Sequence, residues 1–284
     1  MRLLQAGTHA IDVSTPRVMG IVNVTSDSFS GGGRLDAQAA IAHARQLVRD
    51  GASIIDVGGE STRPNATPVD EDVELDRIVP VVAALARDGV CVSVDTMKPA
   101  VMRAAIAAGA SMINDVRALQ AEGALEVAAD SDVAVCLMHM QGEPRTMQQA
   151  PAYRDVVAEV RAFLGRRAHA CIDAGIAAER IVIDPGFGFG KSVAHNLDLL
   201  RHVGEFGALG FPVLVGLSRK SMIGALTGRE IDDRQAGSIA AALLAALRGA
   251  RILRVHDVRA TVDALAVWQA VEQGRSLRDP AIEQ

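Results

Sequence analysis

Polar residues that could take part in chemistry stand at, or directly after, the ends of eight short apolar segments of this sequence. One such segment, 133–138, is typical of a buried strand, yet it ends on His139 and a glycine-containing turn. The residues in this position are, in chain order, Asn23, Asp56, Asp95, Asn114 with Asp115, His139, Asp184, Ser218 with Arg219 and Lys220, and Arg254 with His256. Carboxylates accept hydrogen bonds, amides donate and accept them, and lysine and arginine only donate. The set predicts a site for a polar ligand.

Each of these residues also has a structural explanation when it is taken alone. Asp, Asn and Ser often cap the helix that follows a strand, so Asp56 or Asp115 could cap a helix or support a neighbouring side chain. Caps do not require a lysine, an arginine and two histidines as well. The complete set therefore favours function, whereas the role of any single member stays open.

The apolar segments alternate with longer segments whose apolar residues recur at helical spacing. The predicted strands are 18–24, 53–57, 90–94, 112–113, 133–138, 181–183, 213–217 and 252–255. The predicted helices are 37–50, 70–87, 99–108, 156–174, 236–247 and 259–273, with weaker patterns at 123–129 and 196–201. Strands that are apolar on both faces and separated by helices indicate a parallel sheet.

The length of 284 residues and the absence of a dividing linker, repeat or charge block favour one domain. We predict an α/β fold, a single (β/α)8 TIM barrel over residues 1–284 with a short N-terminal lead-in of about 17 residues. The carboxyl ends of the strands of such a barrel meet at one face, where active sites of this fold lie. The strand-end residues would then form one site.

Charge and composition exclude several classes of function. The net charge of -5, from 34 acidic and 29 basic residues, provides no broad field for nucleic acid or an anionic membrane, so any anion site must be local. The three cysteines, Cys91, Cys136 and Cys171, lie in or beside apolar segments without metal-type spacing and are expected to be reduced core thiols. With no signal pattern or membrane-length apolar run, we expect a soluble, cytoplasmic protein.

Glycine-rich loops follow several of the predicted strands. The segments 23–33 and 58–68 are long polar loops, which we interpret as mobile lids. The segment 184–192, "DPGFGFGKS", lacks the spacing of a phosphate-binding loop because Pro185 stands six residues before Lys191. Its glycines would instead let the backbone and the ring of Phe187 or Phe189 approach a flat ligand.

Eight motifs in order, over nearly the whole chain, resemble the dihydropteroate synthase family. They read "MGIVNVTSDSFSGGG", "IIDVGGESTRP", "SVDTMKPAV", "MINDV", "CLMHMQGEPRTMQ", "IDPGFGFGKS", "VGLSRKSMIG" and "RVHDV". The resemblance implies a barrel enzyme that joins 6-hydroxymethyl-7,8-dihydropterin pyrophosphate to p-aminobenzoate, releasing pyrophosphate and forming dihydropteroate for folate synthesis. It also implies a homodimer and a target of sulfonamides, which mimic p-aminobenzoate.

The matching positions imply roles for individual residues. Asn23 resembles the residue that binds Mg2+ beside the pyrophosphate, which suits an oxygen ligand for a hard cation. The residues that resemble the pterin site are Asp95, Asn114 and Asp184, with Met138 and Phe189 lining the slot. A carboxylate there could accept hydrogen bonds from the donor-rich edge of an aminopterin.

Other matched residues would lie near p-aminobenzoate and pyrophosphate. Lys220 resembles the lysine near both the pterin and p-aminobenzoate, and Ser218 with Arg219 resembles the edge of the aminobenzoate pocket. The residues that resemble the pyrophosphate clamp are Arg63, Arg254 and His256, since a forked guanidinium matches phosphate oxygens. Thr62 would contact ligands from the second long loop, and the residues expected to act in catalysis are Asp95, Lys220 and Arg63.

Some residues keep a second interpretation. Arg63 taken alone would be a solvated loop charge, and His256 before Asp257 could cap a helix. His139 receives no chemical step, and we expect a structural or supporting role for it. The chain departs from the family pattern at Ser26, Gly31 and Asn65, where proline, aspartate and glycine are usual, so the stiffness of both long loops differs.

The resemblance implies a dissociative substitution. The aniline nitrogen of p-aminobenzoate is neutral at pH 7, so the demanding step is loss of pyrophosphate. Arg63, Arg254, His256 and Mg2+ would stabilise the departing charge, and Asp95 would stabilise a pterin cation. The alternatives are a non-catalytic pterin-binding paralogue, the pterin-binding module of a corrinoid methyltransferase, and a nucleotide-dependent dehydrogenase, which the missing glycine fingerprint argues against.

Overall fold

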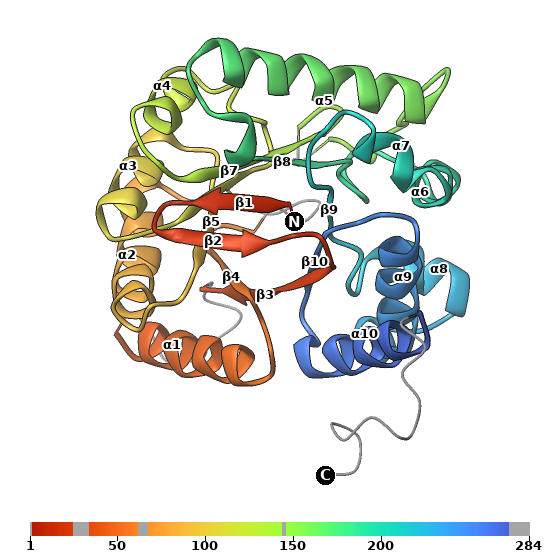
Figure 1. Cartoon of the computed structure of the whole chain (residues 1–284), viewed down its shortest axis with the longest axis horizontal. Helices are drawn as coiled ribbons and strands as arrows, with labels where there is room; N and C mark the ends of the chain where they lie inside the picture. Colours follow the sequence, from red (N-terminus) through yellow and green to blue (C-terminus); the bar gives the residue numbers. More distant parts are fainter. Residues whose placement is uncertain (1, 25–33, 62–67, 144–145, 273–284) are drawn as a thin grey trace.

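The computed structural model describes residues 2–24, 34–61, 68–143 and 146–272. Within these ranges, eight parallel strands form a barrel surrounded by helices (Figure 1). The barrel strands are β3 (Arg17–Asn23), β4 (Ile54–Gly58), β5 (Val92–Asp95), β6 (Met112–Asp115), β7 (Ala134–Met138), β8 (Ile181–Asp184), β9 (Leu214–Val215) and β10 (Ile252–Val255). The predicted (β/α)8 TIM barrel is therefore confirmed.

The strand order around the barrel follows the sequence. Strands β3 to β8 pair with their neighbours in chain order, β10 pairs with β3, and β9 pairs with β10. A parallel bridge between Ile183 and Val213 closes the ring, and the N–H of Ile183 donates to the carbonyl of Pro212 at 3.0 Å. The closed ring leaves no long strand edge exposed.

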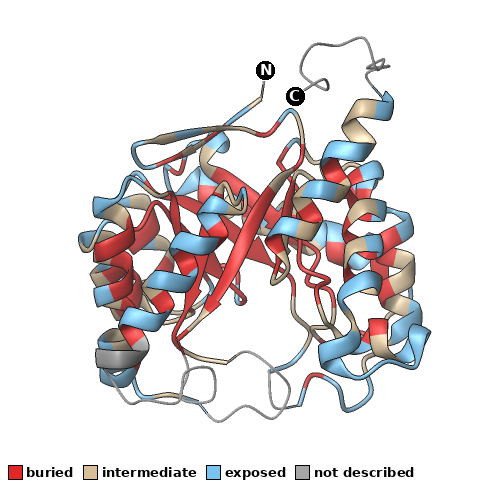
Figure 2. Cartoon of the chain, turned by 90° about the horizontal axis from the view of Figure 1, so that it is seen from below, coloured by how far each residue is buried: buried red, intermediate tan, exposed pale blue. Residues whose placement is uncertain are grey.

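The strands form where short apolar runs can be buried on both faces. All residues of β4, β5, β6, β7 and β8 are buried, as Figure 2 shows for the centre of the barrel. The strand β6 extends two residues past the predicted 112–113 to include Asn114 and Asp115. The strand β9 is shorter than the predicted 213–217, since Val213 takes part in the bridge that closes the barrel.

The helices lie outside the barrel, with exposed residues on their outward faces (Figure 2). Their bounds are α1 (Arg34–Arg49), α2 (Glu71–Arg87), α3 (Pro99–Ala107), α4 (Ala124–Ala129), α5 (Val156–Asp173), α6 (Val193–Arg201), α7 (Val203–Gly207), α8 (Ser221–Thr227), α9 (Gln235–Leu247) and α10 (Val258–Glu272). The six predicted helices agree to within three residues at each end. None of the helices in the described ranges is both long and apolar enough to cross a membrane.

A capping box explains why α6 begins earlier than the predicted 196. The Ser192 hydroxyl accepts from the N–H of His195 at 3.2 Å, and His195 Nδ1 accepts from the N–H of Ser192 at 3.3 Å. Two orphan backbone donors are thereby satisfied, so the helix can start at Val193. The cap also fixes where the loop after β8 ends.

The predicted lead-in is an antiparallel hairpin, β1 (Leu3–Ala6) and β2 (His9–Asp12), which lies across one end of the barrel (Figures 1 and 2). It contributes to a compact apolar cluster with side chains of the barrel strands. The members are Leu4, Ala6, Val13, Met19, Ile54, Cys91, Met112, Ala134, Cys136, Val182, Leu214 and Ile252. This cluster fills the amino-terminal end of the barrel, which leaves the carboxyl end for a site.

Candidate active site at the carboxyl ends of the strands

An arginine and two carboxylates form the centre of the strand-end cluster. The guanidinium of Arg254 at the end of β10 donates from Nε to Asp56 Oδ2 at 2.6 Å and from Nη2 to Asp95 Oδ2 at 2.8 Å. Asn114 Nδ2 donates to the same Asp56 oxygen at 3.2 Å. Four strands, β4, β5, β6 and β10, therefore contribute to one hydrogen-bonded group. The predicted residues Asp95, Asn114 and Arg254 come together.

Burial dominates the electrostatics of this group. The pKa of Asp95 is raised to about 7. Burial is the main cause, the positive charge of Arg254 acts against it, and the negative charge of Asp56 adds to the rise. Burial alone would lower the pKa of Arg254, but the charges of Asp56 and Asp95 outweigh it and raise that pKa. Asp56 Oδ1 is buried and accepts no hydrogen bond from the described residues. The site thus presents an acceptor that a ligand donor could satisfy.

Asp184 ends β8 on the same face of the barrel. Its Oδ1 accepts from the N–H of Gly186 at 2.7 Å. Burial raises the pKa of Asp184, while the positive charge of Lys220 and this hydrogen bond act in the opposite direction. A buried carboxylate with one backbone partner retains capacity to accept from a ligand.

Lys220 approaches the loop that follows β8. Its Nζ donates to the carbonyl of Phe187 and lies 4.6 Å from the centroid of the Phe189 ring. Burial lowers the pKa of Lys220 to about 8, partly offset by Asp184. Phe187 is fully buried, so its ring packs in the core. Phe189 is half-buried, and its ring lies on the side of the site. The structure thus brings the predicted Lys220, Phe189 and Asp184 together.

Ser218 and His256 are neighbours, whereas Arg219 faces another residue. The Ser218 hydroxyl lies 2.9 Å from His256 Nδ1 and accepts from the N–H of His256 at 3.3 Å. The Arg219 guanidinium donates to both carboxylate oxygens of Asp257, from Nη2 at 2.8 Å and from Nε at 3.3 Å. Arg219 is therefore committed to a salt bridge, and contact of its guanidinium with p-aminobenzoate stays a prediction.

Two predicted residues complete the described part of the site. Asn23 ends β3 half-buried, in register with Gly58 of β4, and its Oδ1 is 3.8 Å from where a Cβ on Gly58 would lie. Met138 is buried at the end of β7. The residues described here contain no group of three or more His, Cys, Asp or Glu that could hold a metal ion. Protein side chains alone would therefore give a cation few ligands.

Several predictions fall outside the described residues. These are the roles of Thr62 and Arg63, the loop departures at Ser26, Gly31 and Asn65, and most of the two long loops. What the structure describes is the base of the second loop. Lys98 Nζ lies 2.6 Å from Glu60 Oε2, Val69 O and Glu74 Oε2. One ammonium therefore joins the residues before and after positions 62–67.

Asp56, Lys98 and Lys191 are the residues that sequence reasoning undervalued. The sequence allows Asp56 to cap a helix or to support a neighbour, and the structure shows that it accepts hydrogen bonds from the side chains of Asn114 and Arg254. A signal was available, because Asp56 is the only charged residue of the otherwise apolar β4. The sequence pattern around Lys191 does not match a phosphate-binding loop, yet the residue is only 2% exposed. A lysine is rarely that buried without partners.

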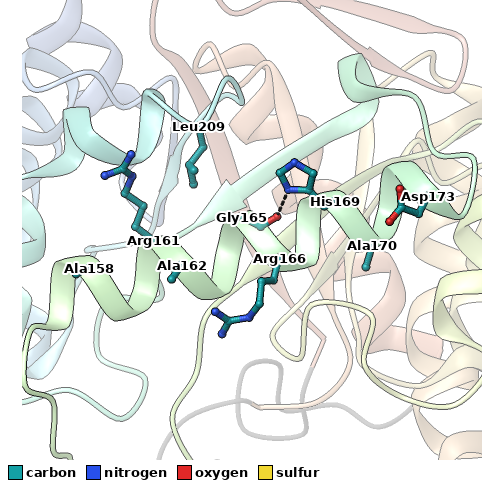
Figure 3. A pocket seen from close by; sticks show the side chains of 9 residues that line it. All are labelled: Ala158, Arg161, Ala162, Gly165, Arg166, His169, Ala170, Asp173 and Leu209. Atoms are coloured by element: carbon teal, nitrogen blue, oxygen red, sulfur yellow. Dashed lines mark hydrogen bonds between the residues drawn. The ribbon is translucent and has the colours of Figure 1, made fainter.

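One hollow of the described structure lies away from the strand ends. A groove of about 600 Å³ lies along the outer face of α5, and Figure 3 shows its lining. The lining side chains include Arg161, Arg166, His169 and Asp173, with Leu209 from the segment after α7. None of the strand-end residues lines this groove. By contrast, the hollow beside Asp95 measures about 10 Å³, room for one water molecule.

The fold and the site define a class of protein. A parallel barrel with buried carboxylates, an amide and basic residues at the carboxyl ends of its strands is typical of an enzyme that binds a polar heterocycle. The family model of pterin binding enzymes matches residues 19–256.

Curated relatives and solved structures agree with that match. The dihydropteroate synthase of Haemophilus influenzae is 52% identical over 269 residues, which cover 94% of this chain and 98% of that relative. A structure of the Xanthomonas albilineans dihydropteroate synthase with 4-aminobenzoic acid has a TM-score of 0.90 at 56% identity, covering 95% of this chain and 98% of that chain. Another, in complex with 7,8-dihydropteroate, has a TM-score of 0.87 at 54% identity, with the same coverage. The chain belongs to the pterin-binding enzyme family and groups there with dihydropteroate synthases.

Proposed function

We infer that this protein joins 6-hydroxymethyl-7,8-dihydropterin pyrophosphate to p-aminobenzoate, giving 7,8-dihydropteroate and pyrophosphate in folate biosynthesis. The observation that carries this conclusion is the buried group of Asp56, Asp95, Asn114 and Arg254 beside Asp184 at the strand ends. The chain has this group in a barrel more than half identical to known synthases. The family indicated by the sequence motifs therefore agrees with the arrangement of the strand-end residues and with the curated relatives.

The site chemistry suits an aminopterin. Such a ring presents amino and ring N–H donors along one edge, and the carboxylate acceptors at the strand ends are Asp95, Asp184 and Asp56, whose Oδ1 has no partner among the described residues. Asn114 can donate and accept with the same side chain. The ring of Phe189 with the ammonium of Lys220 supplies an adjoining surface for a flat ligand. Polar atoms thus fix the orientation of the ring, and its faces are left for apolar contact.

The reaction breaks the C–O bond between the pterin methylene and pyrophosphate, and the electron pair leaves on the pyrophosphate oxygen. The amine of p-aminobenzoate then donates its lone pair to form the C–N bond and loses a proton to solvent. Negative charge on Asp95 stabilises the cation that forms on the pterin. Arg254 can support the leaving group as well, since its Nη1 makes no hydrogen bond to a described residue and can donate to a phosphate oxygen.

Mg2+ fits this site only with help from the substrate. Asn23 Oδ1 is an amide oxygen at the rim, and the described residues supply no cage around it. A hexacoordinate hard cation would take its other ligands from pyrophosphate oxygens and water. When bound, Mg2+ neutralises developing charge on pyrophosphate. Isothermal titration of pyrophosphate should show Mg2+-dependent binding that Asn23→Ala weakens; binding indifferent to both would contradict the assignment.

A direct assay tests the function. Purified protein with both substrates and Mg2+ should release pyrophosphate and form dihydropteroate in equal amounts. Release of pyrophosphate without dihydropteroate would indicate hydrolysis instead. Pterin binding without either product would favour the non-catalytic paralogue. Arg161→Lys, on the outer face of α5, is a control variant away from the strand-end site and should keep both products in equal yield.

Assembly and location follow from the same family assignment. We propose a homodimer in the cytoplasm, supported by the resemblance and by three buried, unpaired cysteines, which suit a reducing compartment. Analytical ultracentrifugation checks the first proposal, because a single species of monomer mass at micromolar concentration would contradict it.

A further inference from the structure

The ammonium of Lys191 lies at the centre of a buried cluster of acceptors behind the active site. Its Nζ is 2.9 Å from the carbonyl oxygens of Gly186 and Phe189, 3.2 Å from the carbonyl of His139 and 3.0 Å from His139 Nδ1. The residue is 2% exposed. No carboxylate lies among these hydrogen-bond partners. The positive charge is therefore held by backbone dipoles and one imidazole.

These acceptors come from two different loops whose backbones touch. Gly186 and Gly190 have φ angles of +70° and +64°, and a Cβ on them would lie 1.9 Å from His139 O and 2.4 Å from Gln141 O. No side chain fits at these distances, so glycine is required at both positions. The close approach lets carbonyls after β7 and after β8 reach a single nitrogen atom.

His139 is held as a neutral acceptor for this lysine. Burial lowers its pKa to about 3, and the charge of Lys191 acts in the same direction. Burial also lowers the pKa of Lys191 to about 7, partly offset by Asp184, and the acceptors within 3.2 Å further favour the ammonium. Phe163 packs edge-on against the His139 ring at 5.0 Å. The aromatic contact and the lysine together orient the imidazole.

The loop fixed in this way sets the position of Lys220. The carbonyl of Phe187 accepts from Lys220 Nζ, and the Phe189 ring lies 4.6 Å from the same nitrogen. A Cβ on Gly188 would lie 3.1 Å from Lys220 Cδ, so the loop backbone also contacts the lysine stem. Any rotation of residues 186–190 would move the groups that locate this ammonium.

We propose that Lys191, through His139 and the carbonyls it binds, is a positioning residue that holds the loop after β8 in the shape that places Lys220 for the reaction. The proposal rests on the proposed function for its kinetic consequence, and on the described contacts for its structural one. It gives His139 a role that the sequence left open. It also explains why the glycine-rich segment ends in a lysine although it binds no phosphate by the usual loop geometry.

A matched cation exists at the opposite end of β8. Arg180 donates from Nε to the carbonyl of Val133 and from Nη2 to that of Ala128, both at 2.9 Å, and so joins backbone segments without touching the site. Lys191→Met and Arg180→Met each remove a cation that binds carbonyls. Comparing the two separates positioning from general stabilisation.

Labelling of the lysines gives a readout that does not depend on activity. The chain has three lysines, Lys98, Lys191 and Lys220, so 13C-lysine NMR should give three resolvable side-chain signals. The titration of Lys220 reports the loop together with Asp95, Asp184 and Arg254, which also act on this ammonium. Lys191 and Lys220 repel each other, so loss of the Lys191 charge alone would also raise the Lys220 pKa, and His139→Leu, which keeps that charge, separates positioning from charge. We expect Lys191→Met to move the Lys220 titration toward the ordinary lysine pKa and to lower kcat at least tenfold. Arg180→Met should leave the titration unchanged and kcat within about twofold.

The outcomes distinguish the two inferences. An unchanged Lys220 titration in folded Lys191→Met would overturn the positioning role, even if activity fell. A Lys220 titration shifted in both Lys191→Met and His139→Leu, in a protein whose wild type makes no dihydropteroate, would support the role and refute the proposed function. His139→Leu removes one acceptor and keeps the Lys191 charge, so it also serves if Lys191→Met does not fold, and His139→Gln restores one acceptor. We expect His139→Leu to shift the Lys220 titration less than Lys191→Met does, and His139→Gln to restore the wild-type titration. Equal Lys220 titrations in the two His139 variants would contradict the proposal.

Discussion

At the amino-terminal end of the barrel, Leu4 and Val13 of the N-terminal segment lie against Met19 and Ile54 of the barrel strands. At the carboxyl end, Arg254 lies on Asp56 and Asp95. The first end is stabilised by removal of apolar surface from water, whereas the second keeps charged groups away from water, which raises the pKa of Asp95, while the two carboxylates raise the pKa of Arg254. One end of the strands therefore supplies stability, and the other end holds the charged side chains of the candidate site.

At the carboxyl end, we expect the largest loss of activity from removal of the Lys220 side chain. We expect Lys220→Ala to lower kcat on the order of a thousandfold, because it removes a preorganised positive charge beside the reacting atoms. The thermal midpoint should change little, since the half-buried residue contributes little to the core. Steady-state kinetics with differential scanning calorimetry checks both statements. Turnover like that of the wild type would refute the role assigned to Lys220.

A second substitution changes charge but keeps shape. Asp95→Asn should lower kcat about a hundredfold and pterin affinity much less, because the carboxylate charge matters most when the pterin becomes cationic. Pre-steady-state turnover and equilibrium titration with the pterin measure the two effects separately. A fall of only severalfold in kcat would mean that Asp95 merely orients the ring.

The displaced pKa values predict a narrow pH profile. Asp95 must be ionised, and its pKa is raised to about 7, so kcat/KM should fall as pH decreases below that value. Lys220 must be protonated, and its pKa is lowered to about 8, so kcat/KM should also fall as pH rises above it. Each limb should approach about a tenfold change per pH unit. The acidic limb should disappear in Asp95→Asn, and a limb that persists there belongs to another group.

A substitution at the amino-terminal end of the barrel should lower stability and leave activity nearly unchanged. Leu4→Ala removes a fully buried side chain from the amino-terminal cluster and should lower the free energy of unfolding by about 2–5 kcal/mol. Below the melting transition, kcat should stay within about twofold of the wild type. Urea unfolding and kinetics at the same temperature provide the measurement. A large loss of kcat in fully folded protein would show that the two ends are coupled.

The barrel could be predicted because its signals are local. Residues 133–138 are apolar on both faces and residues 252–255 are apolar except for Arg254, which indicates burial between helices, and the observed strands lie within a residue of those ranges. The hairpin β1–β2 and the helices α7 and α8 were not predicted as elements. Each has at most seven residues, too few for a hydrophobic period to stand out.

The family, the order of the strands and the residue types at the strand ends can be read from the sequence, since motifs and periodicity depend on neighbouring positions. Which of these groups contact one another depends on the folded structure. Asp56 and Arg254 are 198 positions apart, and His139 and Lys191 are 52 apart. Closing the barrel places them within hydrogen-bond reach and removes water from them, and these two effects set their partners and displace the pKa values of Arg254, His139 and Lys191.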